Sequence, residues 1–336
     1  MSANRPSSGL LPDGFRWGVV GAGAWGARVA DAISGLDGHA LRAVYDVDLA
    51  RGRGVAERHG AVVATTVEGL AAVGVDAAVV ATPPASHGAV GLRLLVAGVS
   101  ALVEKPLTHA AARELVQAAR RTGHRVGVGH QLLHHEAIAR LRALLASGAL
   151  GEVRRAEAYR LAPTTRSSLD AWWELGPHDV AVVCHLLGSA PEAVRVRAQS
   201  AGASAVVAEL TWRSGARAEL RASYVHPTRE RRLVLSTEAG PVEFCEDAAG
   251  DALTLPPGVR GISPDADAGR PLQRELCAFA RAVAHGGALL GGEEDTLLAA
   301  AVLSSGAESL ARGGGWRAVR RAARGALAEA EVVTPQ

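Results

Sequence analysis

The basic residues of this sequence are almost all arginine, and Lys105 is the only lysine among 36 Lys and Arg residues. An arginine side chain is always charged and forked, whereas a lysine ammonium is compact and has a pKa that its surroundings can move. A site that needs proton transfer or a compact positive charge therefore cannot exchange its lysine for arginine. Pro106 follows Lys105 and could fix it through a cis peptide bond. The alternative interpretation of Lys105 is a surface lysine retained by chance.

A second group of reactive side chains lies in the run Trp172-Trp173-Glu174-Leu175-Gly176-Pro177-His178-Asp179, which we interpret as a turn that leads into a helix over 178–187. A histidine at a helix start has its charged form disfavoured by the helix dipole, as suits a neutral general base. Glu174, four residues earlier, is placed to orient His178 or to hold a substrate hydroxyl. A capping cluster without catalysis is the alternative that this spacing leaves open.

The third motif is a glycine-rich turn with GxGxxG spacing, which is weak evidence by itself in a chain with 39 glycines. Here it follows a strand-like run and opens a helix, and Asp46 ends the next strand-like run. Glycines let the backbone approach a pyrophosphate, the helix N-terminus stabilises its charge, and a carboxylate accepts hydrogen bonds from a ribose diol. We predict a dinucleotide site formed by Gly21, Gly23, Ala24, Trp25, Gly26 and Asp46. The alternative is a glycine-rich turn in a flavodoxin-like sheet that binds no dinucleotide.

Asp46 favours NAD over NADP, because its carboxylate would repel a 2′-phosphate. Arg51 and Arg53 lie close to Asp46 in the sequence, so NADP stays an alternative.

Further candidates for cofactor contacts stand at the ends of two later strand-like runs, where open parallel sheets bind their ligands. They are Thr82, Pro83 and His87 after one run, and Glu104 and Lys105 after the next. A histidine in a first helical turn needs no ligand to explain it, so a local role of His87 is the alternative. Glu104 could pair with the Lys105 ammonium or orient it, or stand exposed at the strand end.

These candidates are positioned by a βαβ pattern in the first 130 residues. Short runs rich in Val and Ala predict buried parallel strands over 16–20, 40–45, 61–65, 77–81, 101–103 and 125–128. Helical stretches separate them over 27–33, 86–97 and 108–121, the last two with Ser86 and Thr108 as N-caps. The fold class is therefore α/β, with an N-terminal Rossmann domain that contains a doubly wound parallel sheet.

The pattern changes after residue 130. A helix over 135–147 and a strand over 152–161 precede the helix with His178, and strand-like runs follow over 193–198, 205–212, 216–225, 231–236 and 241–245. They predict an open, mostly antiparallel sheet. A loop over 247–270 leads to helices over 272–284, 293–311 and 316–330. We expect a flexible tail over 1–14, a dinucleotide-binding domain over 15–130, and a substrate-binding and oligomerisation α/β domain over 131–336.

Composition excludes several classes of protein. The net charge is +2 with scattered basic residues, which argues against nucleic acid, and no uncharged apolar window is long enough to span a membrane. The first residues have no apolar segment typical of a signal peptide, and three widely spaced cysteines fit a reducing cytoplasm. We expect no metal site, because the histidines lack partners at metal-ligand spacing: His130, His134, His135 and His185.

In order and spacing, the segments GAGAWG (21–26), ATPPASH (81–87), VEKPL (103–107), VGH (128–130), GALGEV (148–153) and WELGPHD (173–179) resemble the glucose-fructose oxidoreductase / inositol dehydrogenase / MocA family. The resemblance covers nearly the whole chain. It implies NAD(P)-dependent hydride transfer at a secondary alcohol of a sugar, nucleotide sugar or cyclitol, with Lys105 and His178 as catalytic residues. It also implies a homodimer or homotetramer formed through the second sheet.

One departure concerns Glu174, since the family usually has Asp at this position. The longer side chain has a different reach, so either the substrate hydroxyl lies elsewhere or Glu174 binds only His178. The segment QLLHHEA after VGH lacks an Arg that some members have there. Two alternatives stay open: an enzyme that uses NAD only transiently, such as an epimerase or lyase, and a non-catalytic NAD-binding regulator.

Overall fold

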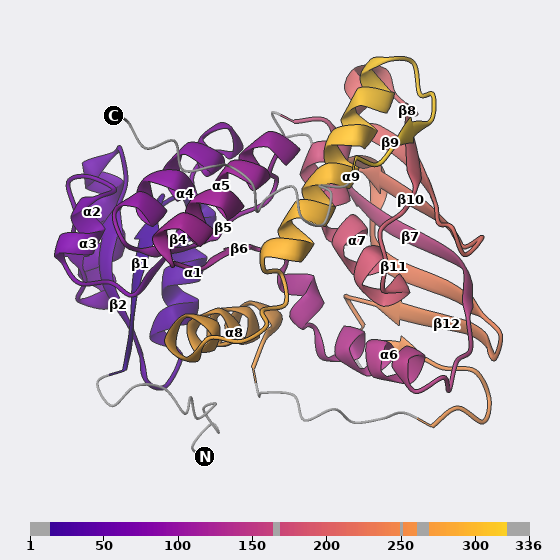
Figure 1. Cartoon of the computed structure of the whole chain (residues 1–336), viewed down its shortest axis with the longest axis horizontal. Coiled ribbons are helices and arrows are strands. Elements are labelled where there is room, and N and C mark those ends of the chain that lie inside the picture. Colours follow the sequence, from indigo (N-terminus) through magenta and orange to yellow (C-terminus); the bar gives the residue numbers. More distant parts are fainter. Residues whose placement is uncertain (1–13, 164–168, 249–250, 261–268, 321–336) are drawn as a thin grey trace, which may run out of the picture.

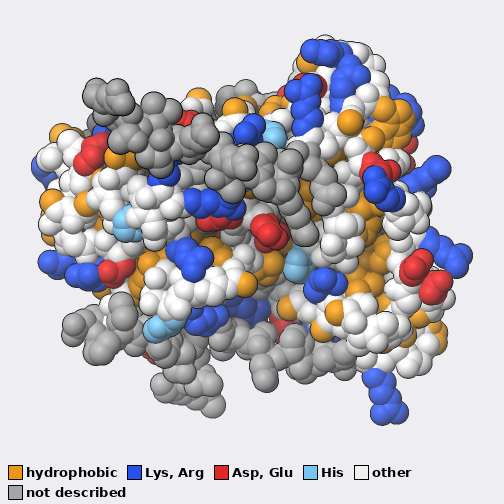
Figure 2. All heavy atoms as spheres, viewed as in Figure 1, with side chains coloured by type: hydrophobic (Ala, Val, Ile, Leu, Met, Phe, Trp, Pro, Cys, Tyr) orange, Lys and Arg blue, Asp and Glu red, His pale blue; other side chains and the backbone are white. Residues whose placement is uncertain are grey.

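A computed structural model describes residues 14–163, 169–248, 251–260 and 269–320. It contains two β-sheets that lie side by side, each packed against helices (Figure 1). Basic and acidic side chains are interspersed on the face drawn in Figure 2, in keeping with the small net charge.

The first sheet is parallel and has the strand order β3-β2-β1-β4-β5-β6. Its strands are β1 (Phe15–Val20), β2 (His39–Tyr45), β3 (Val62–Val63), β4 (Ala77–Val80), β5 (Ser100–Val103) and β6 (Val126–Val128). The associated helices are α1 (Ala24–Ser34), α2 (Leu49–His59), α3 (Gly69–Ala72), α4 (His87–Val96) and α5 (His109–Thr122). Every residue of β4 and β5 is buried, as parallel strands covered on both faces require. The predicted doubly wound sheet is confirmed.

The second sheet is mixed and mostly antiparallel, in the order β13-β12-β11-β7-β10-β9-β8-β14, with β10 and β7 parallel. Its strands are β7 (Val153–Pro163), β8 (Ala193–Ala198), β9 (Ala205–Thr211), β10 (Arg217–Ser223), β11 (Val225–Thr237), β12 (Gly240–Cys245), β13 (Leu253–Thr254) and β14 (Arg317–Ala318). Buried and accessible residues alternate along β7 and β9, because one face is covered and the other is open. Helices α6 (Glu136–Ala146), α7 (Ala171–Leu187) and α9 (Glu293–Ala311) lie on the covered side (Figure 1).

Helix α8 (Pro271–His285) returns to the first sheet after the second sheet is complete (Figure 1). Its buried residues Leu276, Cys277 and Phe279 share a core with Phe15 and Trp17 of β1. The division of the chain at residues 130 and 131 stays a proposal, and α8 shows that the segment after it contributes to both halves.

Two sequence-based expectations are wrong. Helix α7 begins at Ala171, because Asp170 caps it by accepting a hydrogen bond from the Trp173 amide, and it continues through Pro177. His178 therefore lies in its third turn and not at a helix start. The helix expected from Trp316 is replaced over 317–318 by β14, which pairs with β8.

Smaller differences concern loops. A short strand, β13, occurs within the loop expected over 247–270, and Ser86 occupies the N-cap position of α4 without a side-chain cap. Thr108 caps α5 as predicted, by accepting from the Ala111 amide. The expected tail, apart from Gly14, and the segment after Arg320 lie outside the described residues.

Close packing in the first βα turn predicts a large effect of Gly26→Ala. A Cβ at Gly26 would lie 1.8 Å from the Gly21 carbonyl oxygen, and backbone cannot yield that far without moving the turn. We expect a loss of about 3 kcal/mol in the free energy of unfolding, measured by denaturant titration. Gly54→Ala in α2 is the control, because its Cβ would meet nothing within 4 Å; we expect a gain of about 0.5–1 kcal/mol. Equal stability of the two variants would contradict the packing argument.

Candidate active site

The glycine-rich turn joins β1 to α1, and its glycines have different structural roles. Gly21 has a φ of 96°, and a Cβ there would lie 2.6 Å from the Ala81 carbonyl oxygen of the neighbouring strand. Gly21 and Gly26 are therefore required by the packing of the turn itself. Gly23 is the N-cap of α1, and a Cβ there would meet nothing within 4 Å. The open space beside Gly23, at the N-terminus of a helix, fits the phosphate groups of a dinucleotide.

Asp46 stands at the end of β2 beside this turn and is buried. Its carboxylate accepts hydrogen bonds from the amides of Ala22 (2.7 Å) and Asp48 (2.8 Å), and from Arg51 Nε (3.2 Å) and Nη2 (3.0 Å). Burial raises the pKa of Asp46, but the hydrogen bonds from Arg51 and the two amides outweigh it and hold the pKa below its usual range. The Arg51 side chain is half exposed, so it can move aside for a ribose that bonds to Asp46.

The turns after β4 and β5 are tied together by His87, which is buried. Its ring nitrogens lie 2.8 Å from the Thr82 carbonyl oxygen and 3.2 Å from the Pro106 carbonyl oxygen. Thr82 and Pro83 are accessible at this edge of the sheet. His87 therefore holds the loops that border the predicted cofactor site, and a direct contact of His87 with a cofactor stays a prediction.

Lys105 lies two residues after the end of β5 and reaches across to the second half of the molecule. The Lys105-Pro106 peptide bond is cis, as the sequence analysis considered. Its Nζ donates to the Glu174 carbonyl oxygen at 3.2 Å and lies 3.7 Å from Glu174 Oε1. The ammonium is thereby held against α7, and 18% of the side chain is exposed to solvent. Lys105 and Glu174, both predicted site residues, thus come together although 69 residues separate them.

His178 lies one turn after Glu174 on α7. Burial lowers its pKa well below 6.5, and the positive charges of Lys105 and Arg160, then of His130 and Arg231, lower it further. The imidazole is therefore neutral near pH 7, as a general base must be. The sequence analysis attributed this neutrality to the helix dipole, but its causes are burial and the nearby positive charges. These basic groups therefore lie close enough to His178 to act on its charge.

Glu104 does not form an ion pair with Lys105 in the part of the chain that the structure describes. It is buried, accepts a hydrogen bond from the Trp25 indole, and has its pKa raised by burial to about 7. Glu275 of α8 is a second buried carboxyl nearby, and burial, followed by the charge of Glu104, raises its pKa well above its usual range. Trp25 therefore connects the glycine-rich turn with the Lys105 loop, a contact that spacing alone does not reveal.

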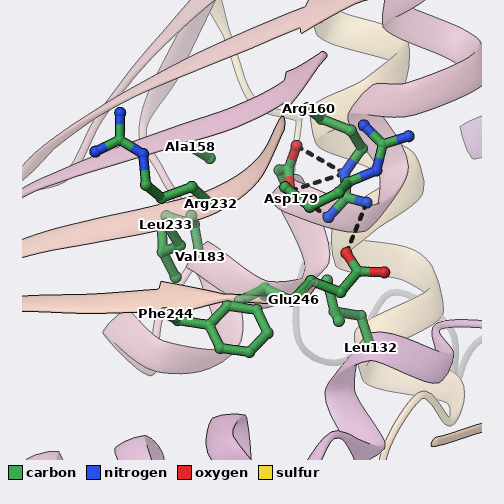
Figure 3. A pocket seen from close by; sticks show the side chains of 11 residues that line it. Leu132, Ala158, Arg160, Asp179, Val183, Arg232, Leu233, Phe244 and Glu246 are labelled. Carbon is green, nitrogen blue, oxygen red and sulfur yellow. Dashed lines mark hydrogen bonds and ion pairs between the residues drawn. The ribbon is translucent and has the colours of Figure 1, made fainter. Parts of the chain in front are cut away.

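Behind His178 lies a buried ionic cluster that the sequence analysis did not identify. Arg160 of β7 donates from Nε and Nη2 to the carboxylate of Asp179, at 2.8–3.1 Å, and from Nη1 to Glu246 at 3.1 Å (Figure 3). Asp179 directly follows His178, so these bonds fix the turn of α7 that carries the imidazole. The sequence alone does not indicate that these three residues meet, because their contact depends on β7 lying against α7.

Among the described residues, no cluster of three or more His, Cys, Asp or Glu side chains is arranged to hold a metal ion. Within the same ranges, no helix combines the length and apolar character that crossing a membrane demands.

Comparison with known proteins gives a consistent result. Residues 15–130 match the model described as "Oxidoreductase family, NAD-binding Rossmann fold", and residues 138–243 match the GFO/IDH/MocA C-terminal domain. The chain is 33% identical over 288 residues to UDP-N-acetylglucosamine 3-dehydrogenase of Acidithiobacillus ferrooxidans, covering 80% of this chain and 89% of that protein. A crystal structure of that name from the same organism superposes with a TM-score of 0.77 at 27% identity, over 88% of this chain and 97% of that one.

The chain is also similar, over a shorter stretch, to inositol 2-dehydrogenase 1 of Saccharopolyspora erythraea, with 40% identity over 122 residues, which is 35% of each protein. The predicted resemblance, α/β fold and NAD-binding oxidoreductase class are confirmed. This chain belongs to the glucose-fructose oxidoreductase / inositol dehydrogenase / MocA family of NAD-dependent oxidoreductases.

Proposed function

We propose that this protein oxidises a secondary alcohol of a sugar, nucleotide sugar or cyclitol to a ketone, or catalyses the reverse reaction. The observation that carries the proposal is the contact of Lys105 Nζ with Glu174 on α7, one turn before His178. It supports a site in which a compact cation and a neutral imidazole act together at the carboxyl edge of the parallel sheet, where such folds bind their ligands. Relatives named as dehydrogenases of UDP-N-acetylglucosamine and of inositol support the substrate classes.

We assign the cofactor site to Gly21, Gly23, Ala24, Trp25, Gly26 and Asp46, with the turns at Thr82, Pro83, His87 and Glu104 along its edge. NAD, when bound, accepts or supplies the hydride. NADP is the alternative, which Asp46 disfavours because a second anion would stand beside its carboxylate.

Each catalytic residue of the proposal has one task. In the oxidation direction, His178 takes the hydroxyl proton on a ring nitrogen, which is available because burial keeps the imidazole neutral. The Lys105 ammonium stabilises the negative charge that develops on the substrate oxygen. Glu174 holds that ammonium in place through its backbone carbonyl and its carboxylate.

We further propose a homodimer or homotetramer in a reducing cytoplasm. The open face of the second sheet supports the oligomer, because it carries a ladder of opposite charges, including Arg155, Glu157, Glu219 and Arg221, that a second copy could match. Sedimentation velocity measures the oligomeric state. All three cysteines are free thiols, which suits a reducing compartment.

The open space at Gly23 predicts that Gly23→Ala separates cofactor binding from folding. The added methyl group touches no protein atom but enters the space assigned to the phosphates. We expect an unchanged melting temperature without cofactor and an NAD affinity reduced by about tenfold or more, measured by calorimetric titration. Gly54→Ala should bind NAD like the natural protein, and equal affinities of both variants would remove Gly23 from the site.

The role of Lys105 predicts that Lys105→Ala reduces kcat by about 10²- to 10⁴-fold and leaves NAD affinity nearly unchanged. Lys105→Arg should fail as well, because a forked guanidinium does not replace a compact ammonium. The assay follows the absorbance of reduced nicotinamide with inositols, free hexoses, amino sugars and nucleotide sugars, using NAD and NADP in parallel. Unchanged turnover in Lys105→Ala would contradict the assignment.

The same panel separates the alternatives. Turnover of a sugar without net reduced nicotinamide, together with a cofactor that co-purifies, would indicate transient redox in an epimerase or lyase. NAD binding without conversion of any substrate would favour a regulator.

The low pKa of His178 predicts the pH dependence of oxidation. The base form persists as pH falls through 6.5, so kcat/KM should stay level there and decline only at clearly lower pH. The measurement is a kcat/KM profile between about pH 5 and 9 on the first substrate that the panel identifies. An acid limb centred at or above 6.5 would show that His178 is not the base.

A further inference from the structure

Two arginines stand opposite each other in the second sheet, next to His178. Arg231 of β11 pairs in register with Arg160 of β7. Leu233 and Leu235, two and four residues beyond Arg231, are buried, so all three side chains point to the face that α7 covers. Like charges directly opposite across strands are destabilising, so this pair requires a compensating charge.

The carboxylates nearby compensate Arg160 but leave Arg231 without an equal partner. Asp179 and Glu246 both bind Arg160, and Asp247 binds Arg229. Within the described ranges, Arg231 has no carboxylate oxygen within 4 Å, and its hydrogen bonds go to the carbonyl oxygens of Leu161 (3.2 Å) and Glu230 (3.4 Å).

The pKa of Arg231 agrees with this lack of a carboxylate partner. Burial, followed by the charges of Arg160 and Arg229, lowers the pKa of Arg231 to about 10, and Glu246 and Asp179 only partly offset the effect. Arg231 is therefore still protonated near pH 7, but its positive charge is costly in the absence of a further anion.

Arg231 lies on the side of the sheet that carries the proposed reaction site, because its register partner Arg160 binds Asp179, the residue after His178. The charge of Arg231 is also one of those that lower the pKa of His178. The gap among Arg160, Asp179, Arg231 and Phe244 has a volume of about 10 Å³, room for a single water molecule (Figure 3). That gap is too small for a ligand group, so we take the approach to Arg231 to be from the side of His178, where the proposed substrate lies.

We propose that the substrate carries an oxyanion, either a phosphoryl group or a carboxylate, and that Arg231 binds it. The inference rests on the proposed function, since it names the class of substrate for the same site. A guanidinium presents two parallel N–H groups that match either oxyanion, and its backbone contacts hold it in place before the substrate arrives. Neutral cyclitols would leave this charge uncompensated, so the proposal favours charged sugars over inositols.

The test measures binding separately from turnover. Protein saturated with NADH is titrated calorimetrically with UDP-N-acetylglucosamine and D-glucuronate, and with their neutral counterparts N-acetylglucosamine and D-glucose. We expect one of the charged sugars to bind at least about tenfold more tightly than its counterpart, which identifies the oxyanion as phosphoryl or carboxylate. Arg231→Met should abolish that preference, and Arg231→Lys should retain part of it.

Arg232→Met is the matched control. The neighbouring Arg232 points away from Arg160 in Figure 3 and lies over the Tyr159 ring on the open face of the sheet, 4.4 Å from its centroid. Its loss should leave the preference intact, and NADH affinity should be the same in all variants if they fold correctly. A second measurement is the acid limb of the kcat/KM profile, which should move to higher pH in Arg231→Met because a cation beside His178 is lost.

Two results would overturn the inference: equal affinity for the charged and neutral sugars, or a preference that persists in Arg231→Met. Binding of a charged sugar that disappears in Arg231→Met, but without turnover, would support anion recognition and count against the proposed dehydrogenase activity. The two hypotheses can thus fail independently.

Discussion

The contact between the Lys105 ammonium and Glu174 is the interaction on which the site depends, because it joins the end of a parallel strand to a helix of the second sheet. Neither half of the molecule contains the whole of the proposed site. The first half carries the glycine-rich turn and the lysine, and α7 carries Glu174 and His178. His87 fixes the lysine side from behind by contacting the carbonyl oxygen of Pro106, and Arg160 fixes the helix side through Asp179.

Burial acts on the ionisable groups around Lys105 in two directions. It lowers the pKa of the histidines, to about 4 for His130, and it raises the pKa of the carboxyls, to about 7 for Glu104. Both effects favour the neutral form, since a charge is costly where water is excluded. The ammonium of Lys105 therefore stands beside histidines that stay neutral, and within the described residues its carboxylate contact within ion-pair distance is Glu174.

The sequence predicts the fold because the fold depends on local patterns, and the residues of the proposed site are chosen from the same patterns. Alternating Val-rich runs and helical stretches specify the parallel sheet, and glycine spacing with Asp46 specifies the dinucleotide turn. The start of α7 was missed because Gly176 and Pro177 look like a turn, whereas the cap at Asp170 and the burial of Trp172 carry the helix through them. The Arg160 cluster and the Trp25–Glu104 hydrogen bond could not be predicted, since each joins residues from separate elements whose register only the fold determines.

The positive charges around His178 also bear on which ligand the proposed site would bind. Lys105, Arg160 and Arg231 all act on His178, and only the first two have carboxylates within ion-pair distance in the described part of the chain. On the inference proposed above, an anionic substrate would pair with Arg231 while Lys105 stays beside the reacting oxygen. The charges that keep the imidazole neutral would then also select the ligand, so that specificity and proton transfer would share one electrostatic cause.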